Sequence, residues 1–265
     1  MTPGDPTDLT QDRVDEFLRG SAVVWRPITV VASTGSTNAD LMAVVASGDV
    51  AEGQTLAAGE QVAGRGRQGR TWASPPGTTL SFSVVLAPPL ERAGFVPALT
   101  ALAVARAIGR VSGVQPSLKW PNDIMIGPDK VAGILAEGSG GRVVVGCGVN
   151  VTVPRSELPV PTATSLALHA DPVDRAELLV AALAELQSAN ELWREAAYSA
   201  LGSGLLDAYR SACETIGSQV QVSLPDGTVA SGIAQGVDDE GRLVLTTESG
   251  HRTLTAGDVT HLRPA

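Results

Sequence analysis

Residues 64–72 constrain this chain more than any other segment, because they read GRGRQGRTW. Glycines let backbone N–H groups come close to an anion, and Arg65, Arg67 and Arg70 supply planar cations suited to phosphate or carboxylate. A flexible, solvated basic loop is the alternative. It is disfavoured because three arginines within six residues stand out in a chain whose net charge is −9. The segment therefore predicts a loop that binds an anionic ligand.

Two common nucleotide-binding motifs are excluded at this loop. Gly64, Gly66 and Gly69 match the bare GxGxxG spacing of a dinucleotide fingerprint, but that motif must open a helix. The residues that follow, TWASPPG, cannot begin one, and the Gly-Lys-Ser/Thr ending of a P-loop is missing from the sequence.

The bulk composition predicts a soluble globular protein, with 43% hydrophobic and 18% charged residues. The negative charge argues against non-specific binding to nucleic acid or to an anionic membrane. No apolar run is expected to reach the ~18 residues of a membrane helix, and the polar, acidic residues 1–19 do not resemble a signal peptide. Cys147 and Cys213 are too few for a disulfide framework, which favours a cytoplasmic protein with reduced cysteines.

Hydrophobic periodicity predicts alternating helices and strands over most of the chain. We expect a helical lead-in within residues 1–20 and a helix that begins with Thr37 as N-cap and ends at Gly48. Further helices are expected over residues 95–111, 175–197 and 205–216. Strands are expected over residues 28–32, 54–59, 78–86, 117–120, 130–137 and 142–151, the last two joined as a hairpin.

The pattern changes in the last fifty residues, where short β-branched stretches alternate with turns such as Pro225-Asp-Gly227. That change suits a small β-barrel appended to an α+β domain. We therefore expect two domains, residues 1–216 and residues 217–265.

The segment Lys119-Trp-Pro-Asn-Asp123 places chemically useful groups at the end of a strand. Pro121 stops the strand, so Asn122 and Asp123 follow on a loop held by a rigid sheet. Lys119 and Lys130 are also the only two lysines, against 17 arginines. Taken alone, Trp120-Pro-Asn-Asp123 could be an ordinary turn, and Lys130 could be a charge at the edge of a strand. Together, however, the segments bring an amide, a carboxylate and two cations to one sheet edge, which is more than a turn requires.

Two further segments are candidates for ligand contacts. Gly146 and Gly148 lie in a predicted strand, which suggests close approach of a ligand or another backbone, and Asn150 at its end needs a hydrogen-bond partner. Cys147 between them is expected to be a small core residue rather than a nucleophile.

The other segment, Ser36-Thr-Asn38, could form with Gln61 a cluster of uncharged donors and acceptors for a polar ligand head. For Thr37 there is a strong alternative, a purely structural role as a helix N-cap, because such caps are common.

Taken in order, these segments resemble the biotin–protein ligase family. The matching motifs are STN, QxxGRGRxGRxW, KWPND, KxAGIL and GxGxNV, and the resemblance covers about residues 28–260. It implies a mixed β-sheet flanked by helices, as in class II synthetases and biotin–lipoate ligases, with a small C-terminal SH3-like β-barrel. Fewer than thirty residues precede the first predicted strand. The resemblance is therefore to the monofunctional type, without a DNA-binding domain.

The resemblance implies an ATP-dependent ligase that forms biotinyl-5′-AMP from biotin and ATP, with Mg²⁺, and passes biotin to a lysine of a biotin carboxyl carrier protein. No DNA or membrane partner is implied. The implied biotin-binding residues are Ser36, Thr37, Asn38, Gln61, Gly64, Arg65, Gly66, Arg67, Lys130 and Gly133. The implied nucleotide-binding residues are Arg65, Arg67, Arg70, Trp72, Lys119, Asn122, Lys130 and Asn150. Lys130, Arg67 and Asp123 are the expected catalytic residues.

Two alternatives are weighed against this interpretation. Lipoate ligases and octanoyl transferases resemble the family in fold, but their RRxxGG and HD signatures are missing from the sequence. A biotin-sensing repressor without turnover would need a DNA-binding element, and the sequence shows no sign of one.

Overall fold

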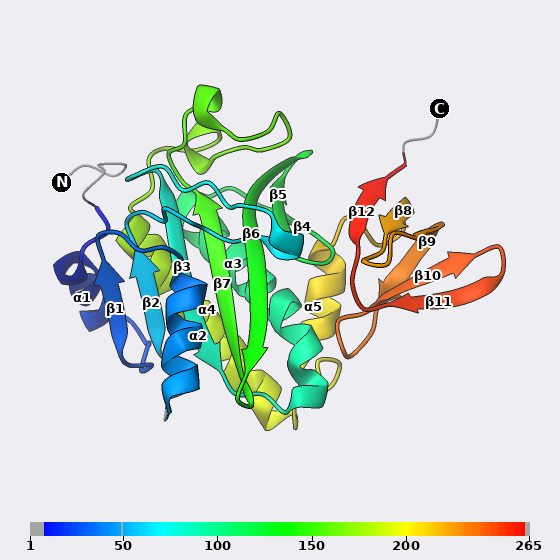
Figure 1. Ribbon diagram of the computed structural model, residues 1–265, viewed down its shortest axis with the longest axis horizontal. Helices are drawn as coiled ribbons and strands as arrows, with labels where there is room; N and C mark the ends of the chain where they lie inside the picture. The colour runs from blue at the N-terminus through cyan, green and yellow to red at the C-terminus, as the bar shows by residue number, and fades with distance from the viewer. Residues whose placement is uncertain (1–7, 49, 263–265) are drawn as a thin grey trace.

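Two β-sheets organise the chain in the computed structural model, which describes residues 8–48 and 50–262 (Figure 1). The larger sheet has seven strands in the order β1-β2-β3-β7-β6-β5-β4. Only β1 and β2 pair in parallel, so the sheet is mixed, as expected. Its strands are β1 Ile28–Val31, β2 Thr55–Ala58, β3 Thr79–Leu86, β4 Ser117–Lys119, β5 Asp123–Ile126, β6 Asp129–Ser139 and β7 Arg142–Asn150.

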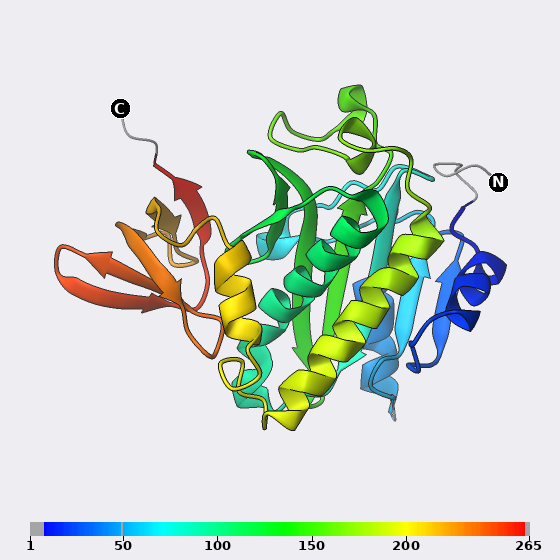
Figure 2. The same ribbon diagram turned by 180° about the vertical axis from the view of Figure 1, so that it is seen from behind.

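Helices cover both faces of this sheet. Helix α2 lies on one face, while α3 and α4 pack against each other on the opposite face (Figures 1 and 2). The α-helices are α1 Gln11–Arg19, α2 Thr37–Ser47, α3 Val96–Ser112, α4 Arg175–Glu195 and α5 Leu205–Ala212. Short 3-10 turns are η1 Arg67–Gly69, η2 Leu90–Phe95, η3 Arg155–Glu157 and η4 Leu166–Leu168.

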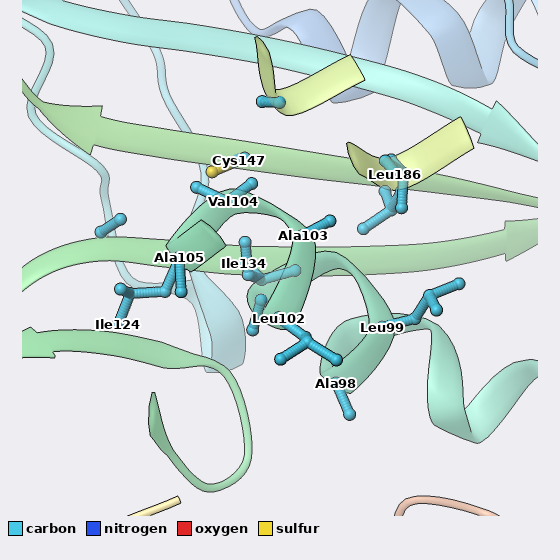
Figure 3. Close-up of a cluster of buried hydrophobic side chains, with 14 of the residues drawn as sticks. Ala98, Leu99, Leu102, Ala103, Val104, Ala105, Ile124, Ile134, Cys147 and Leu186 are labelled. Carbon is cyan, nitrogen blue, oxygen red and sulfur yellow. The ribbon is translucent and has the colours of Figure 1, made fainter. Parts of the chain in front are cut away.

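Helix α3 forms the centre of the core because it is apolar on nearly every side. Figure 3 shows its side chains meeting Ile124 of β5, Ile134 of β6, Cys147 of β7 and Leu186 of α4. Each fully buried aliphatic side chain of this kind stabilises the fold by roughly 1.5–3 kcal/mol.

The same helix corrects one sequence expectation. With η2 it forms a continuous segment, Leu90–Ser112, whose 23 residues are long and apolar enough to cross a membrane by length and composition. The expectation that no apolar run reaches this length was therefore wrong. Its most apolar stretch is 67% buried inside the protein, and a helix enclosed between a sheet and another helix needs apolar residues all round.

The second sheet is separate, C-terminal and antiparallel, as expected, with the order β11-β10-β9-β8-β12. Its strands are β8 Gln219–Ser223, β9 Val229–Val237, β10 Leu243–Thr247, β11 Gly250–Leu254 and β12 Asp258–His261. Several contacts join the β9–β10 turn to the rest of the chain, among them a hydrogen bond from the N–H of Leu201 to Asp239 Oδ1 (2.7 Å). Trp120 Nε1 donates to the carbonyl of Gly241 (2.9 Å), and Arg92 pairs with Asp239 (2.8 Å).

Most expected boundaries lie within two residues of the observed ones, and three local differences are larger or bear on the site. Ser36, not Thr37, is the N-cap of α2: its hydroxyl accepts the N–H of Ala39, and Thr37 is the first helical residue. Strand β5 was missed, since four residues before a Gly-Pro turn carry little periodicity. Helix α5 ends at Ala212 rather than at residue 216. Residues 1–7 of the expected lead-in lie outside the described residues.

Candidate active site

One cavity of about 490 Å³ gathers residues from every segment singled out in the sequence. It lies among the start of α2, the arginine-rich loop after β2, strands β5 to β7, and the start of β12. The predicted residues that line it are Ser36, Thr37, Asn38, Gln61, Arg65, Gly66, Arg67, Arg70, Trp72, Lys119, Asn122, Asp123, Lys130, Gly133 and Asn150. Gly64 lines a neighbouring cavity of about 370 Å³, between the loop and β6.

One part of the cavity is polar without being charged. Gln61 Oε1 accepts the backbone N–H of Thr37 (2.8 Å), and Asn38 Oδ1 accepts the hydroxyl of Ser83 (2.6 Å). The Thr37 and Ser83 hydroxyls are themselves 2.7 Å apart. Ser36, Thr37 and Asn38 are all buried, so these groups are held in fixed orientations away from bulk water.

Glycines form the floor of the cavity on β6 and β7. Gly133 and Gly148 are register partners, and the indole of Trp72 lies over both. A Cβ at Gly148 would come within 2.4 Å of that indole, and one at Gly146 within 2.3 Å of Asn38 Oδ1. Larger residues would displace both side chains, so the glycines set the shape of the site.

The charged part of the cavity centres on Lys130. Its Nζ atom lies 2.6 Å from Asp123 Oδ1 and 5.6 Å from the centroid of the Trp72 ring. The backbone of Lys130 is fixed as well: its N–H donates to the carbonyl of Thr162, and its carbonyl accepts the N–H of Thr164, both at 2.8 Å. The side chain of Lys130 therefore lines the cavity from a position whose backbone is fixed by two hydrogen bonds.

The arginine-rich loop is tied to both domains. Arg67 donates to Asn122 Oδ1 (2.9 Å), and Arg70 donates to both carboxylate oxygens of Asp258 on β12 (2.9 and 3.0 Å). Burial lowers the pKa of Arg67, but a guanidinium stays charged at neutral pH. The N–H of Trp72 donates to the carbonyl of Gly64 (2.9 Å), which closes the loop.

The structure shows the surroundings of two residues of β7, Asn150 and Cys147, for which expectations were drawn from the sequence. Asn150 has a hydrogen-bond partner, because its amide donates to the carbonyl of Thr164 (2.9 Å). Cys147 is buried, and burial raises the pKa of its thiol. A protonated, buried thiol is a core residue rather than a nucleophile.

Sequence reasoning missed several residues of the site. Glu137 on β6 pairs with Arg65 (3.3 Å) and accepts a hydrogen bond from Asn38 (2.9 Å). Its position two and four residues after Leu135 and Gly133, on the same face of a strand, was a usable signal. The contact of Asp258 with the loop spans 188 residues and leaves no such signal.

The arrangement joins a neutral hydrogen-bonding cluster to a group of cations across a floor of glycines. A ligand that fits both parts has an uncharged polar head and an anionic tail, and the further arginines and Lys119 suit a second, phosphate-bearing ligand. Among residues 8–48 and 50–262, no group of three His, Cys, Asp or Glu side chains could hold a metal ion.

Comparisons with known proteins agree with this geometry. Residues 30–153 match the model of the biotin/lipoate A/B protein ligase family, and residues 215–262 match the biotin protein ligase C-terminal domain. The chain is 42% identical to a biotin–[acetyl-CoA-carboxylase] ligase of Mycobacterium tuberculosis, over 96% of each protein. It is 31% identical to the Paracoccus denitrificans ligase of the same name, over 87% of this chain and 98% of the relative.

A solved structure is also similar. The biotin protein ligase from Aquifex aeolicus in complex with biotin and ATP superimposes with a TM-score of 0.75 at 26% identity, covering 91% of this chain and all (100%) of that one. These matches confirm the resemblance found in the sequence motifs. The chain belongs to the biotin/lipoate A/B protein ligase family.

Proposed function

We propose that this protein is a biotin–protein ligase, which forms biotinyl-5′-AMP from biotin and ATP and transfers biotin to a lysine of a biotin carboxyl carrier protein. The observation that carries the proposal is the joining of an uncharged polar cluster to a cationic group in one cavity. The names of the Mycobacterium and Paracoccus relatives, and the biotin and ATP of the Aquifex complex, support biotin over lipoate as the substrate.

Biotin matches both parts of the cavity. Its head is a neutral cyclic urea with two N–H donors and one carbonyl acceptor, and its tail ends in a carboxylate. Ser36, Thr37, Asn38 and Gln61 supply hydroxyl and amide groups for the urea. Arg65, Arg67 and Lys130 line the same cavity and suit the carboxylate, with the backbone of Gly64 and Gly66 beside them.

The first step brings two anions together, since the biotin carboxylate must attack the α-phosphate of ATP. Fixed cations offset this repulsion, and a site shielded from water strengthens them. Arg67 and Lys130 are assigned this role. The other nucleotide contacts are assigned to Arg70, Trp72, Lys119, Asn122 and Asn150. Mg²⁺ prefers phosphate oxygens and water, so it is expected to accompany ATP, and no protein ligand is assigned to it.

The second step needs a neutral lysine amine from the carrier. Asp123 is the assigned general base, because its carboxylate lines the cavity and reaches Lys130 Nζ. When Lys130 turns to a phosphate or carboxylate of the substrates, Asp123 becomes free to orient the amine and accept its proton. No covalent enzyme intermediate is required.

The domain bounds and the cellular location belong to the same proposal. We assign residues 1–216 to a catalytic domain and residues 217–265 to an SH3-like domain that contributes Asp258 to the site. A cytoplasmic location follows from the function, since the carrier of a carboxylase and ATP must both be within reach.

A pyrophosphate-release assay tests the proposed function. The protein is incubated with ATP and Mg²⁺, and with biotin, lipoate or no acid, followed by a biotin carboxyl carrier domain or its variant lacking the acceptor lysine. The expected result is biotin-dependent pyrophosphate release and labelling of the intact carrier alone. Release with lipoate but not biotin would assign the protein to the lipoate branch of the family.

A further inference from the structure

We infer that Glu137 is a positioning residue that fixes the orientation of the Asn38 amide and thereby sets the site's preference for an N–H donor on the ligand head. The inference rests on the proposed function, because the ligand head is taken to be the urea of biotin. Glu137 lies on β6 and lines the smaller cavity beside the arginine-rich loop.

The two oxygens of Glu137 have different partners. Oε2 accepts a hydrogen bond from Asn38 Nδ2 at 2.9 Å, while Oε1 lies 3.3 Å from Arg65 Nη2. One carboxylate thus joins the polar cluster to the loop that carries the arginines. The Arg65 side chain is 52% exposed, so this ion pair adds little to stability by itself. The buried amide of Asn38 is the partner that matters.

The hydrogen bonds of Asn38 leave its amide only one satisfactory orientation. Its Nδ2 group has two hydrogens, and they go to Glu137 Oε2 and to the carbonyl of Leu135 (3.2 Å). Both partners can only accept. If the amide turned over, its oxygen would face two acceptors and both hydrogen bonds would be replaced by repulsion.

The hydroxyl on the other side of the amide cannot impose this orientation. Ser83 Oγ lies 2.6 Å from Asn38 Oδ1 and donates to it. A hydroxyl can donate or accept, however, so Ser83 would tolerate either orientation of the amide. Glu137 and the Leu135 carbonyl therefore decide the orientation, and of these only Glu137 carries a charge that strengthens the bond.

The consequence is a specificity rule for the ligand. Asn38 Oδ1 lies over Gly146 on the cavity floor, where its second lone pair can accept a hydrogen bond. An N–H donor of a cyclic urea is matched at this position, whereas a ligand that presents an acceptor is rejected. Changing Glu137 should weaken the ligand head's contacts without disturbing Lys130 or Arg67.

The test is a double-mutant cycle on Glu137 and Asn38. Biotin affinity is measured by calorimetry, without ATP, for the parent, Glu137→Gln, Asn38→Ala and the double variant. Glu137→Gln is nearly isosteric but lets either end of its amide face Asn38. We expect it to weaken biotin binding about tenfold. In the Asn38→Ala background the same change should have little further effect, limited to the loss of the exposed Arg65 ion pair.

A matched control is available in the chain. Glu185 pairs with Arg110 at 3.5 Å, and their side-chain exposures of 26% and 54% match the 24% and 52% of Glu137 and Arg65. Glu185→Gln, on helix α4 and away from the cavity, should bind biotin like the parent. All variants are compared at a temperature at which thermal unfolding shows each to be folded.

Kinetics separate positioning from general damage. For Glu137→Gln the KM for biotin should rise in step with its dissociation constant, while the KM for ATP and kcat change less than about threefold. Biotin binding within twofold of the parent, or equal losses with and without Asn38, would overturn the inference. A parent protein that binds no biotin would instead refute the proposed function.

Discussion

Lys130 Nζ lies 2.6 Å from Asp123 Oδ1, so the cation assigned to the first step and the base assigned to the second form one ion pair. Both side chains are only partly exposed, at 32% and 25%. An anionic substrate at Nζ competes with Asp123 for the same charge. Binding of the substrate carboxylate and phosphate to Lys130 would then release the carboxylate of Asp123, which the second step needs. Asp123 would therefore become available only after the first step has begun.

Replacing Lys130 by alanine should slow adenylate formation. The variant loses a charge that acts on the developing phosphate, and removal of one such preorganised contact lowers the rate by roughly 10²–10³-fold. Single-turnover formation of biotinyl-5′-AMP measures the effect. Arg106→Ala, which removes an exposed cation on α3, is the control. Adenylate formation at the parental rate in Lys130→Ala would remove Lys130 from the mechanism.

Replacing Asp123 by asparagine should affect the second step more than the first. General-base catalysis contributes roughly 10²–10⁴-fold, so transfer from preformed biotinyl-5′-AMP to the carrier should slow by a factor in that range. Adenylate formation should fall less, since Lys130 remains. Equal slowing of both half-reactions would show that Asp123 serves only to hold Lys130.

Replacing Arg67 by glycine should let the adenylate escape. Arg67 is partly buried in the loop beside Asn122, and loss of a charge-assisted hydrogen bond weakens retention by roughly ten- to a hundredfold. The released anhydride would label surface lysines of a bystander such as albumin. Incubating the variant with albumin, biotin and ATP tests this. Unlabelled albumin, with the adenylate still bound, would mean that Arg67 does not retain it.

Histidine 261 should make stability depend on pH. Burial, and secondarily the charge of Lys119, lower the pKa of His261 below its usual 6.5. The unfolded chain then binds the proton more tightly, so this contribution to stability is present above about pH 6.5 and is lost as the pH falls below it. Its Nε2 atom lies 3.3 Å from Thr215 Oγ1, which accepts the N–H of Trp120.

The check on His261 is urea denaturation at pH 8 and at pH 5.5. The parent should lose more stability over this interval than His261→Gln. The exposed His251 on β11 provides the control, because His251→Gln should keep the parental pH dependence. Identical slopes for the parent and His261→Gln would contradict the prediction.

The sequence motifs predicted which residues share the cavity better than they predicted the contacts between them. Lys130, Arg67 and Asn122 each belong to a short motif, and all three line the same cavity; their roles in the reaction stay predictions. The pairing of Arg70 with Asp258 could not be predicted, since it depends on how the C-terminal sheet docks against the loop.

Local ambiguity explains the remaining differences. Ser36 and Thr37 are equally good caps by residue type, and only the backbone of Ser36, extended at φ −160° and ψ 126°, decides between them. Helix α3 read as an ordinary apolar helix, and its burial by α4 depends on packing between segments distant in sequence. Strand β5 is too short for its period to be read.

Direct identification of the ligand retained by the protein tests the central claim. The protein is mixed with biotin, ATP and Mg²⁺, freed of unbound small molecules, denatured, and analysed by mass spectrometry. The account predicts biotinyl-5′-AMP as the retained species, with Lys130→Ala retaining little or none under the same conditions. Recovery of biotin and ATP without the adenylate from the folded parent protein would contradict it.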